Sequence, residues 1–381
     1  MYVIKDTMLL FIRYILCSVI CQCTTAFIYN CNTARNFLHM RQETPNTLWS
    51  TLSSTFKNNA RDWFIQRAER KNISWNSITN KYKTPNNKQI LMELYNVIED
   101  KDIEYPSYYT QPFHGYDTGN LNWLAAQEGE AATLSMSVNY WDNVSPYIAE
   151  QWVRLNVSSH INNYIKTQQL DYPYHILDMG CYIGVSTEYL YNSFRRTKNI
   201  QGLDLSTYFL SVASFRKHER NLSINYIHGN AENTKLPARS YNMIVCNFML
   251  HEVPNNATKN ILNEIYRILK PGGVIVIVDL DPIRVQNNLI VSQFRKWAFE
   301  VTEPHIYEYY KHDMNVRLLD ANFKYIVTNK NDPINRVWIG TKQNNEYTMH
   351  KHYAFTTHTY PSYQIQPMGN ISVKGINSYI Q

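Results

Sequence analysis

The sequence predicts an α/β fold: a mostly parallel sheet with a C-terminal antiparallel hairpin, preceded by a helical region. From residue 176 onward, short apolar runs alternate with segments of helical length, the pattern of parallel strands joined by helices. Two later runs, 323–328 and 336–341, are separated by Asn-Asp-Pro, which is typical of a hairpin. With 381 residues, 44% of them apolar, the chain can bury a large core.

Residues 1–42 are predicted to be a leader. Lys5 and Arg13 accompany an apolar stretch that ends in small residues, which is the layout of a secretory signal peptide. The following stretch opens on Phe27 and has no acid before Glu43, like a transit peptide. The pair resembles the bipartite leader of plastids bounded by extra membranes, so we expect a plastid protein that travels by the secretory route. The endoplasmic reticulum, secretion and a merely disordered N-terminus are the alternatives.

Net charge and hydropathy limit the classes of partner that the protein is expected to bind. The chain carries a net charge of +6, and four basic residues and one acidic residue lie in 1–42, so the remainder carries +3. This is too little to indicate a nucleic-acid partner. The apolar stretch of the leader is short and is interrupted by Arg13, so we expect no stable membrane span in the mature protein.

Residues 43–170 are expected to form a helical front end. Apolar spacing predicts helices at 49–70, 87–99, 121–140 and 144–165. Residues 105–120, rich in Pro, Gly and aromatic side chains, are either a packed connector or a lid. We call residues 105–120 the covering segment.

The chain is organised around a turn that follows the first predicted strand. The apolar run 176–177 ends in Asp178, Gly180 and Gly184 follow, and a helix is expected at 185–194. Glycines at such a turn let the backbone approach a ligand closely. Tyr182 occupies the middle position, where a dinucleotide fingerprint has glycine.

The next apolar run, 200–203, ends in Asp204, which can accept hydrogen bonds from both hydroxyls of a ribose. We therefore expect a nucleoside ligand. The carboxylate of Asp178 would repel a pyrophosphate but suits a ligand that carries an ammonium or sulfonium group.

The remaining elements complete the predicted domain, 171–342. Helices are expected at 207–219, 258–270, 293–300 and 307–319, and strands at 224–228, 241–247 and 274–278. Residues 343–381 are polar and lack a period, so we expect a tail.

The motif of Asp178, Gly180 and Gly184 resembles the first motif of class I S-adenosylmethionine-dependent methyltransferases of the type 11 kind, Asp-x-Gly-x-Gly-x-Gly, from which Tyr182 departs. Pro-Gly-Gly at 271–273 is a second sign of that family. Residues 62–68 and 105–123 look like a group from photosynthetic bacteria and plastids. The resemblance implies a Rossmann-like seven-stranded sheet and S-adenosylmethionine as cofactor.

The resemblance also implies further cofactor-binding residues. Family members usually have Gly-Asp-Ala after the third strand, where the acid binds the adenine amino group. Asn230 replaces that acid, so one charge-assisted hydrogen bond is lost. Leu205 and Ala231 are expected to sandwich the adenine, and Asn247 ends the fourth strand beside the cofactor.

The expected function is methyl transfer to the oxygen or carbon of a small-molecule acceptor. His251 and Glu252 follow the fourth strand and are the candidates for a general base, although a His-Glu pair before a proline can simply cap a turn. No metal-ligand spacing is present. The alternatives are a regulatory or assembly protein that binds the cofactor without catalysis, and a nucleotide-dependent oxidoreductase.

Overall fold

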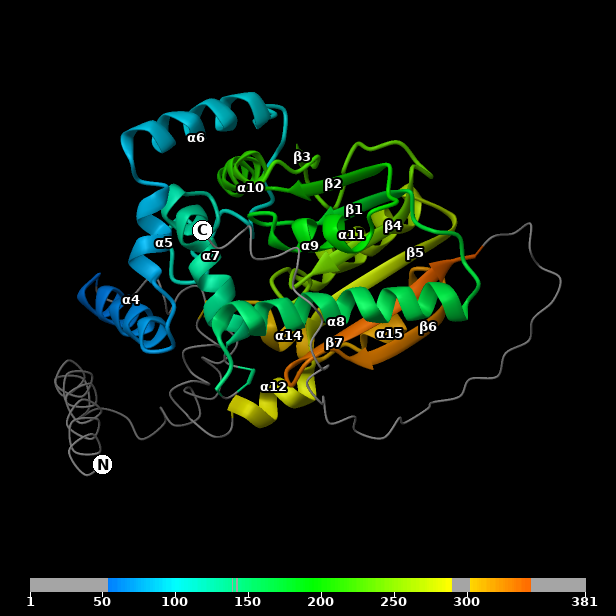
Figure 1. Ribbon diagram of the computed structural model, residues 1–381. Helices are drawn as coiled ribbons and strands as arrows, with labels where there is room; N and C mark the ends of the chain where they lie inside the picture. The colour runs from blue at the N-terminus through cyan, green and yellow to red at the C-terminus, as the bar shows by residue number, and fades with distance from the viewer. Residues whose placement is uncertain (1–53, 139, 142, 290–301, 344–381) are drawn as a thin grey trace, which may run out of the picture.

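A computed structural model describes residues 54–138, 140–141, 143–289 and 302–343 (Figure 1). The predicted leader, the helix expected at 293–300 and all of the predicted tail except residue 343 lie outside these residues. The domain boundaries placed at 42, 170 and 342 stay predictions.

Seven strands form one sheet in the order β3-β2-β1-β4-β5-β7-β6. Strands β1 to β5 pair in parallel, whereas β7 is antiparallel to both β5 and β6. The predicted fold class, a Rossmann-like and mostly parallel sheet with a C-terminal antiparallel hairpin, is confirmed. The strands are β1 His175–Met179, β2 Asn199–Asp204, β3 Asn225–His228, β4 Tyr241–Asn247, β5 Leu269–Leu280, β6 Phe323–Lys330 and β7 Asn335–Lys342.

The register brings the ends of three strands together. Met179, the last residue of β1, pairs with Leu203 of β2 and with Cys246 of β4. The next residues of the neighbouring strands are Asp204 and Asn247, so both lie beside the turn that follows β1. In an open α/β sheet this carboxyl edge is where ligands bind.

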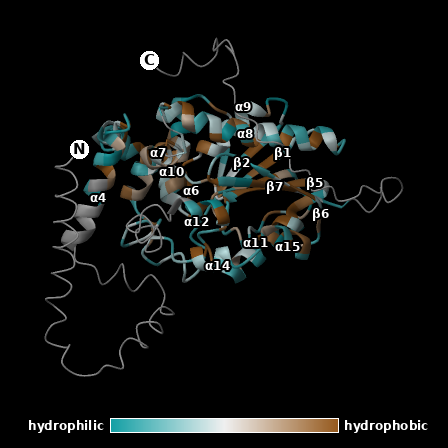
Figure 2. Ribbon diagram, turned by 90° about the horizontal axis from the view of Figure 1, so that it is seen from below, coloured by the Kyte–Doolittle hydropathy of each residue, from teal (hydrophilic) through white to brown (hydrophobic). Residues whose placement is uncertain are grey.

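Two layers of helices cover the sheet because successive strand residues point to opposite faces. Ile176 and Val245 pack under α8 Pro146–Thr167 and α9 Val185–Ser193. Leu177 and Ile244 belong to the core on the other face, which includes side chains of α11 Asn255–Ile268, α14 Ile306–Tyr310 and α15 Met314–Asp320. The strands are the most hydrophobic part of the molecule (Figure 2).

The helical front end packs beside α10 Thr207–Glu219, which precedes β3 (Figure 1). Buried Arg216 of α10 forms ion pairs with Glu130 (2.6 Å) and with Glu188 of α9 (3.0 Å), and these tie the front end to the sheet domain. No helix among the described residues is long and apolar enough to span a membrane. The front-end helices before α8 are α4 Ser54–Glu69, α5 Trp75–Lys81, α6 Pro85–Ile98 and α7 Trp123–Ser137.

Some local predictions differ from the structure. The helix predicted at 307–319 is two helices, because Asp313 caps α15 by accepting a hydrogen bond from the backbone N–H of Asn315. Helices α5 and α12 Pro282–Leu289 were not predicted. Strand β5 includes Pro-Gly-Gly, but its pairing with β4 is irregular there and resumes in register at Val274.

Candidate functional site

The Asp178 carboxylate lies inside the turn after β1 and has no exposed surface. It accepts hydrogen bonds from Ser186 Oγ (2.6 Å), Thr187 Oγ1 (2.6 Å) and Asn247 Nδ2 (3.2 Å). Burial raises the pKa of Asp178, and these hydrogen bonds act in the opposite direction. Asp178 thus connects β1, α9 and β4.

Gly180 and Gly184 both adopt the left-handed conformation, with φ values of +73° and +80°. A Cβ at Gly180 would lie 2.5 Å from Met249 Sδ, and one at Gly184 would lie 2.2 Å from the Tyr226 hydroxyl. The two glycines therefore give the turn its left-handed shape, and they also leave space for the side chains of Met249 and Tyr226.

Tyr182, at the position where the family motif has its central glycine, also has a positive φ, +53°. Its ring packs edge-to-face on Phe209, with centroids 4.4 Å apart. A Cβ on Gly129 of α7 would come within 2.8 Å of the Tyr182 hydroxyl. The space that the tyrosine needs is thus provided by a glycine on the helical front end.

Asp204 ends β2 with its carboxylate turned toward the β1 turn. Its two oxygens accept the backbone N–H groups of Tyr182 (2.8 Å) and Ser206 (2.9 Å). Burial raises the pKa of Asp204 to about 6, although these two hydrogen bonds favour the ionised form.

The other predicted cofactor residues follow the neighbouring strands. Leu205 is buried, and Ala231 packs against the main core. Asn230 Oδ1 accepts the backbone N–H of Glu232 (2.9 Å), so this amide stabilises its own turn. Asn247 Oδ1 is buried, and no described residue donates a hydrogen bond to it.

The covering segment lies against the carboxyl edge of the sheet. Tyr108 donates a hydrogen bond to Glu232 (2.8 Å), and the Asn120 carbonyl accepts one from Ser206 Oγ (2.7 Å). Tyr105 lies 3.3 Å from Nε2 of His228, the last residue of β3. The segment therefore contacts residues that follow β2 and β3, which is compatible with a packed connector as well as with a lid.

His251 is buried after β4, where its Nδ1 lies 2.6 Å from Asp279 Oδ1. Burial disfavours the imidazolium, but the charge of Asp279 and its hydrogen bond outweigh this, and the pKa of His251 rises to about 10. An imidazole that is already protonated at neutral pH cannot accept a proton.

Glu252 is half-buried, and burial raises its pKa to about 7 while His114 and His251 act against this. Nε2 of His114 lies 3.6 Å from Glu252 and 2.9 Å from Glu303. Glu303 lies just before α14, so the sequence alone did not connect it with this site. We call His114, His251, Glu252, Asp279 and Glu303 the carboxylate–histidine cluster.

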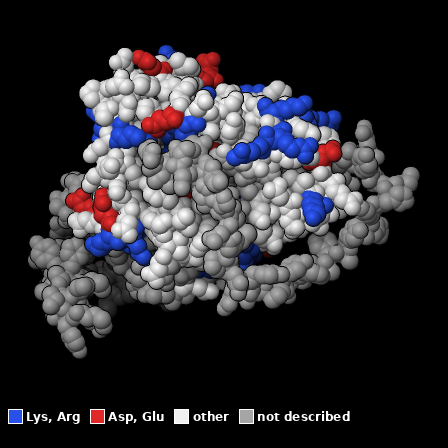
Figure 3. Space-filling model, viewed as in Figure 1, with Lys and Arg blue, Asp and Glu red and all other residues white. Residues whose placement is uncertain are grey.

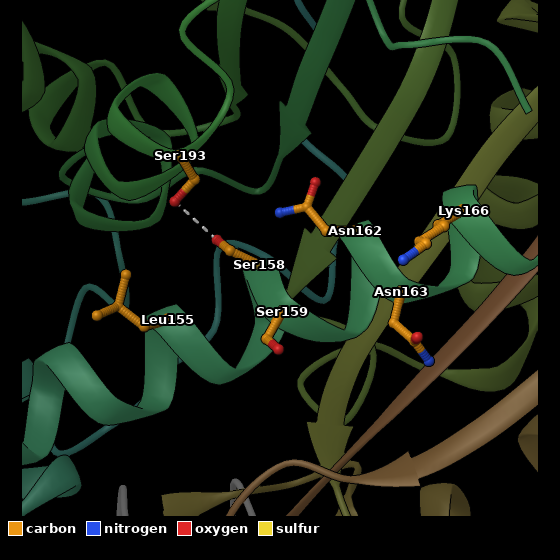
Figure 4. Close-up of a pocket in the computed structure, with 7 residues that line it drawn as sticks. All are labelled: Leu155, Ser158, Ser159, Asn162, Asn163, Lys166 and Ser193. Atoms are coloured by element: carbon orange, nitrogen blue, oxygen red, sulfur yellow. Dashed lines mark hydrogen bonds between the residues drawn. The ribbon is translucent and has the colours of Figure 1, made fainter. Parts of the chain in front are cut away.

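No described group of His, Cys, Asp and Glu side chains is arranged to hold a metal ion. A groove of about 550 Å³ lies on α8 and includes Lys166 and Ser193 (Figure 4). It is separate from the carboxyl edge, and none of the predicted site residues lines it.

The sheet order, with β7 antiparallel beside β5, is that of a class I methyltransferase domain, the class whose methyl donor is S-adenosylmethionine. Residues 176–273 match a family model described as a methyltransferase domain.

Proteins with similar sequences or folds are named as methyltransferases. A demethylmenaquinone methyltransferase of Bacillus licheniformis is 36% identical over 103 residues, which are 27% of this chain and 43% of the relative. One from Oceanobacillus iheyensis is 33% identical over 104 residues, with the same coverage. The chain thus spans less than half the length of these relatives. The human N-acetylserotonin methyltransferase structure has a TM-score of 0.43, 13% identity and 71% coverage of both chains.

The site residues fit this cofactor. A carboxylate can accept about four hydrogen bonds, and Asp204 uses two of them for backbone N–H groups. The carboxylate can therefore still accept a hydrogen bond from a ribose hydroxyl. Leu205 follows β2 and Ala231 follows β3, so both lie beside the strand ends where an adenine would bind.

Proposed function

We propose that the protein transfers a methyl group from S-adenosylmethionine to the oxygen or carbon of a small-molecule acceptor. Asp204 would hold the ribose, and Leu205, Asn230 and Ala231 would hold the adenine. When bound, the cofactor supplies an electrophilic methyl group. The chain itself aligns the two reactants and takes a proton from an acidic acceptor.

The observation that carries the catalytic proposal is the environment of Glu252. A general base works best when its pKa lies near the working pH, and the pKa of Glu252 is about 7. Glu252 follows β4 and lies near the covering segment, where an acceptor would be enclosed. We assign the base to Glu252 and a positively charged, supporting role to His251.

Quinone-type acceptors are the first to test, because the curated relatives are named for methylation of demethylmenaquinone. The experiment is mass spectrometry of extracts and candidate quinones incubated with the protein and isotope-labelled methyl donor. A labelled product that requires Glu252 supports the proposal. Absence of any labelled product with a correctly folded protein argues against it.

Calorimetry tests the cofactor separately. We expect S-adenosylmethionine or S-adenosylhomocysteine to bind and NADH not to bind. Asp204→Ala should weaken binding by about 1.5–3 kcal/mol, the net value of two partly buried hydrogen bonds. Equal or tighter binding of NADH would favour an oxidoreductase, and an unchanged affinity in Asp204→Ala would make this residue only a cap.

The second candidate is a regulatory or assembly protein that binds the cofactor without transferring the methyl group. Asn230 favours it, because this amide replaces the usual acid and already accepts a hydrogen bond from Glu232. Tyr182 does not favour it, because its ring packs on Phe209 and Gly129. Cofactor binding without any labelled product would support this candidate.

For partners and location, we propose that the protein binds no nucleic acid and enters a plastid by the secretory route. The small net charge of +3 outside the leader supports the first proposal, although Figure 3 shows one group of neighbouring basic residues at the upper right of this face. A reporter fused to residues 1–60 tests the second. Cytosolic fluorescence would contradict both targeting steps, and retention in the endoplasmic reticulum would contradict only plastid import.

A further inference from the structure

The carboxylate–histidine cluster joins parts of the chain that are distant in sequence. Nε2 of His114 lies between Glu252 and Glu303, and Glu303 is 189 residues further along the chain. The covering segment therefore brings a titratable group to the residues that follow β4.

The backbone holds His114 in an uncommon conformation. His114 and Gly115 have φ values of +50° and +83°, and they form the centre of a two-residue turn. Two hydrogen bonds between Phe113 and Tyr116, of 2.8 and 3.0 Å, close this turn. A histidine with positive φ is uncommon, and such residues concentrate at functional sites.

The charges of the carboxylate–histidine cluster indicate the role of His114. The cluster contains three carboxylates, and His251 is paired with Asp279. His114 is thus the histidine in direct contact with both Glu252 and Glu303, and His251 adds a smaller electrostatic effect on Glu252. Among the described residues, none donates a hydrogen bond to Glu303 Oε2, although this atom is buried.

The remaining titratable neighbours do not replace His114. Burial lowers the pKa of His305, which lies near Glu303, so it is neutral near pH 7. Besides His251 and Asp279 of the cluster, the groups near Glu252 are Tyr109, Tyr182 and Cys246. Burial raises the pKa of each of these three, so they are uncharged near pH 7.

We propose that His114 is a positioning residue that keeps Glu252 ionised when the covering segment lies over the site. This inference rests on the proposed function and assigns it an acceptor with an ionisable hydroxyl group. The hydroxyl proton passes to a carboxylate oxygen of Glu252 and leaves the electron pair on the acceptor. When the segment moves away, Glu252 loses the positive charge of His114, so its pKa rises further and it binds a proton more readily.

The first test uses histidine NMR on the full chain without cofactor. The His114 signal is identified by its absence in His114→Gln. Its pKa should lie above that of a free imidazole, because Glu303 and Glu252 outweigh the effect of burial. Glu303→Gln should lower this pKa by about one unit or more. An ordinary pKa in the wild type, unchanged in Glu303→Gln, would overturn the proposal.

The second test is the pH profile of kcat/KM with any acceptor that becomes labelled. His114→Gln should move the acidic limb to higher pH by about one unit, with unchanged affinity for S-adenosylhomocysteine. At high pH, where Glu252 is ionised without His114, the variant should regain most of its activity. The matched control is His160→Gln on α8, whose histidine contacts the Lys330 carbonyl, and its profile should not move.

The two proposals fail in different ways. If the proposed function is wrong, no cofactor binds or no acceptor is labelled, while the NMR test still decides the His114 contact. If only the present inference is wrong, methyl transfer occurs and the acidic limb of His114→Gln coincides with that of the wild type.

Discussion

The turn after β1 and the cluster after β4 both bury carboxylates at the same edge of the sheet, but they satisfy them differently. Asp178 receives three hydrogen bonds from nearby side chains. Glu252 shares one histidine with Glu303, which has an oxygen without a described donor. Hydrogen bonds from neutral side chains fix Asp178 within the fold, whereas Glu252, which lies beside histidines and whose pKa is raised to about 7, is suited to proton transfer.

The largest effect should come from Asp178→Ala, which tests whether the turn is structural. Ser186, Thr187 and Asn247 would lose their acceptor while buried, so we expect a loss of about 3 kcal/mol in the free energy of unfolding. Urea unfolding measures it. Asp178→Asn, which preserves size and one carbonyl oxygen, should lose much less. Weakened cofactor binding with unchanged stability would contradict this assignment.

Glu252→Gln tests the other half of the comparison. Loss of the general base should lower kcat by about a hundredfold, which corresponds to about 2.7 kcal/mol. The affinity for S-adenosylhomocysteine, measured by calorimetry, should stay within a few-fold. His251→Ala is the comparison variant. If turnover falls in His251→Ala but not in Glu252→Gln, His251 is the general base instead.

The pH dependence of stability distinguishes His251 from Glu252. A raised His pKa adds stability that is fully present below pH 6.5 and is lost as the pH rises through about 10. Between pH 7 and 9 we expect a loss on the order of 2 kcal/mol, measured by urea unfolding at each pH. The slope should be absent in His251→Gln. An equal slope in that variant would show that other groups cause it.

The smallest effect concerns the contact between the turn and α7. Gly129→Ala should destabilise the protein by about 1–2 kcal/mol, because the new Cβ would overlap the ring of Tyr182. Thermal unfolding of Gly129→Ala, Tyr182→Ala and the double variant measures the coupling. Gly129→Ala should lower stability much less in the Tyr182→Ala background than in the wild type. If the stability losses of the two single variants simply add in the double variant, the two residues do not interact.

The local sequence determined much of the fold. The predicted bounds of α10 and β4 match the structure, β1 is one residue longer than predicted at each end, and β2 begins one residue earlier. Apolar runs, Asp178 and the turn glycines sufficed because strands covered by helices on both faces are apolar throughout, helices bury one face, and such turns need left-handed residues. The family resemblance, rather than the local pattern, implied that Asn247 would lie beside the same ligand as Asp204.

Only the tertiary structure decided which polar groups complete the site. Asp178 looked available to a ligand, but its lone pairs accept hydrogen bonds from α9 and β4. His114 and Glu303 have no sequence relation that predicts their contact, because it depends on the covering segment folding across the edge of the sheet. Burial and neighbouring charge set the pKa values of His251 and Glu252, and both depend on the packed environment rather than on residue type.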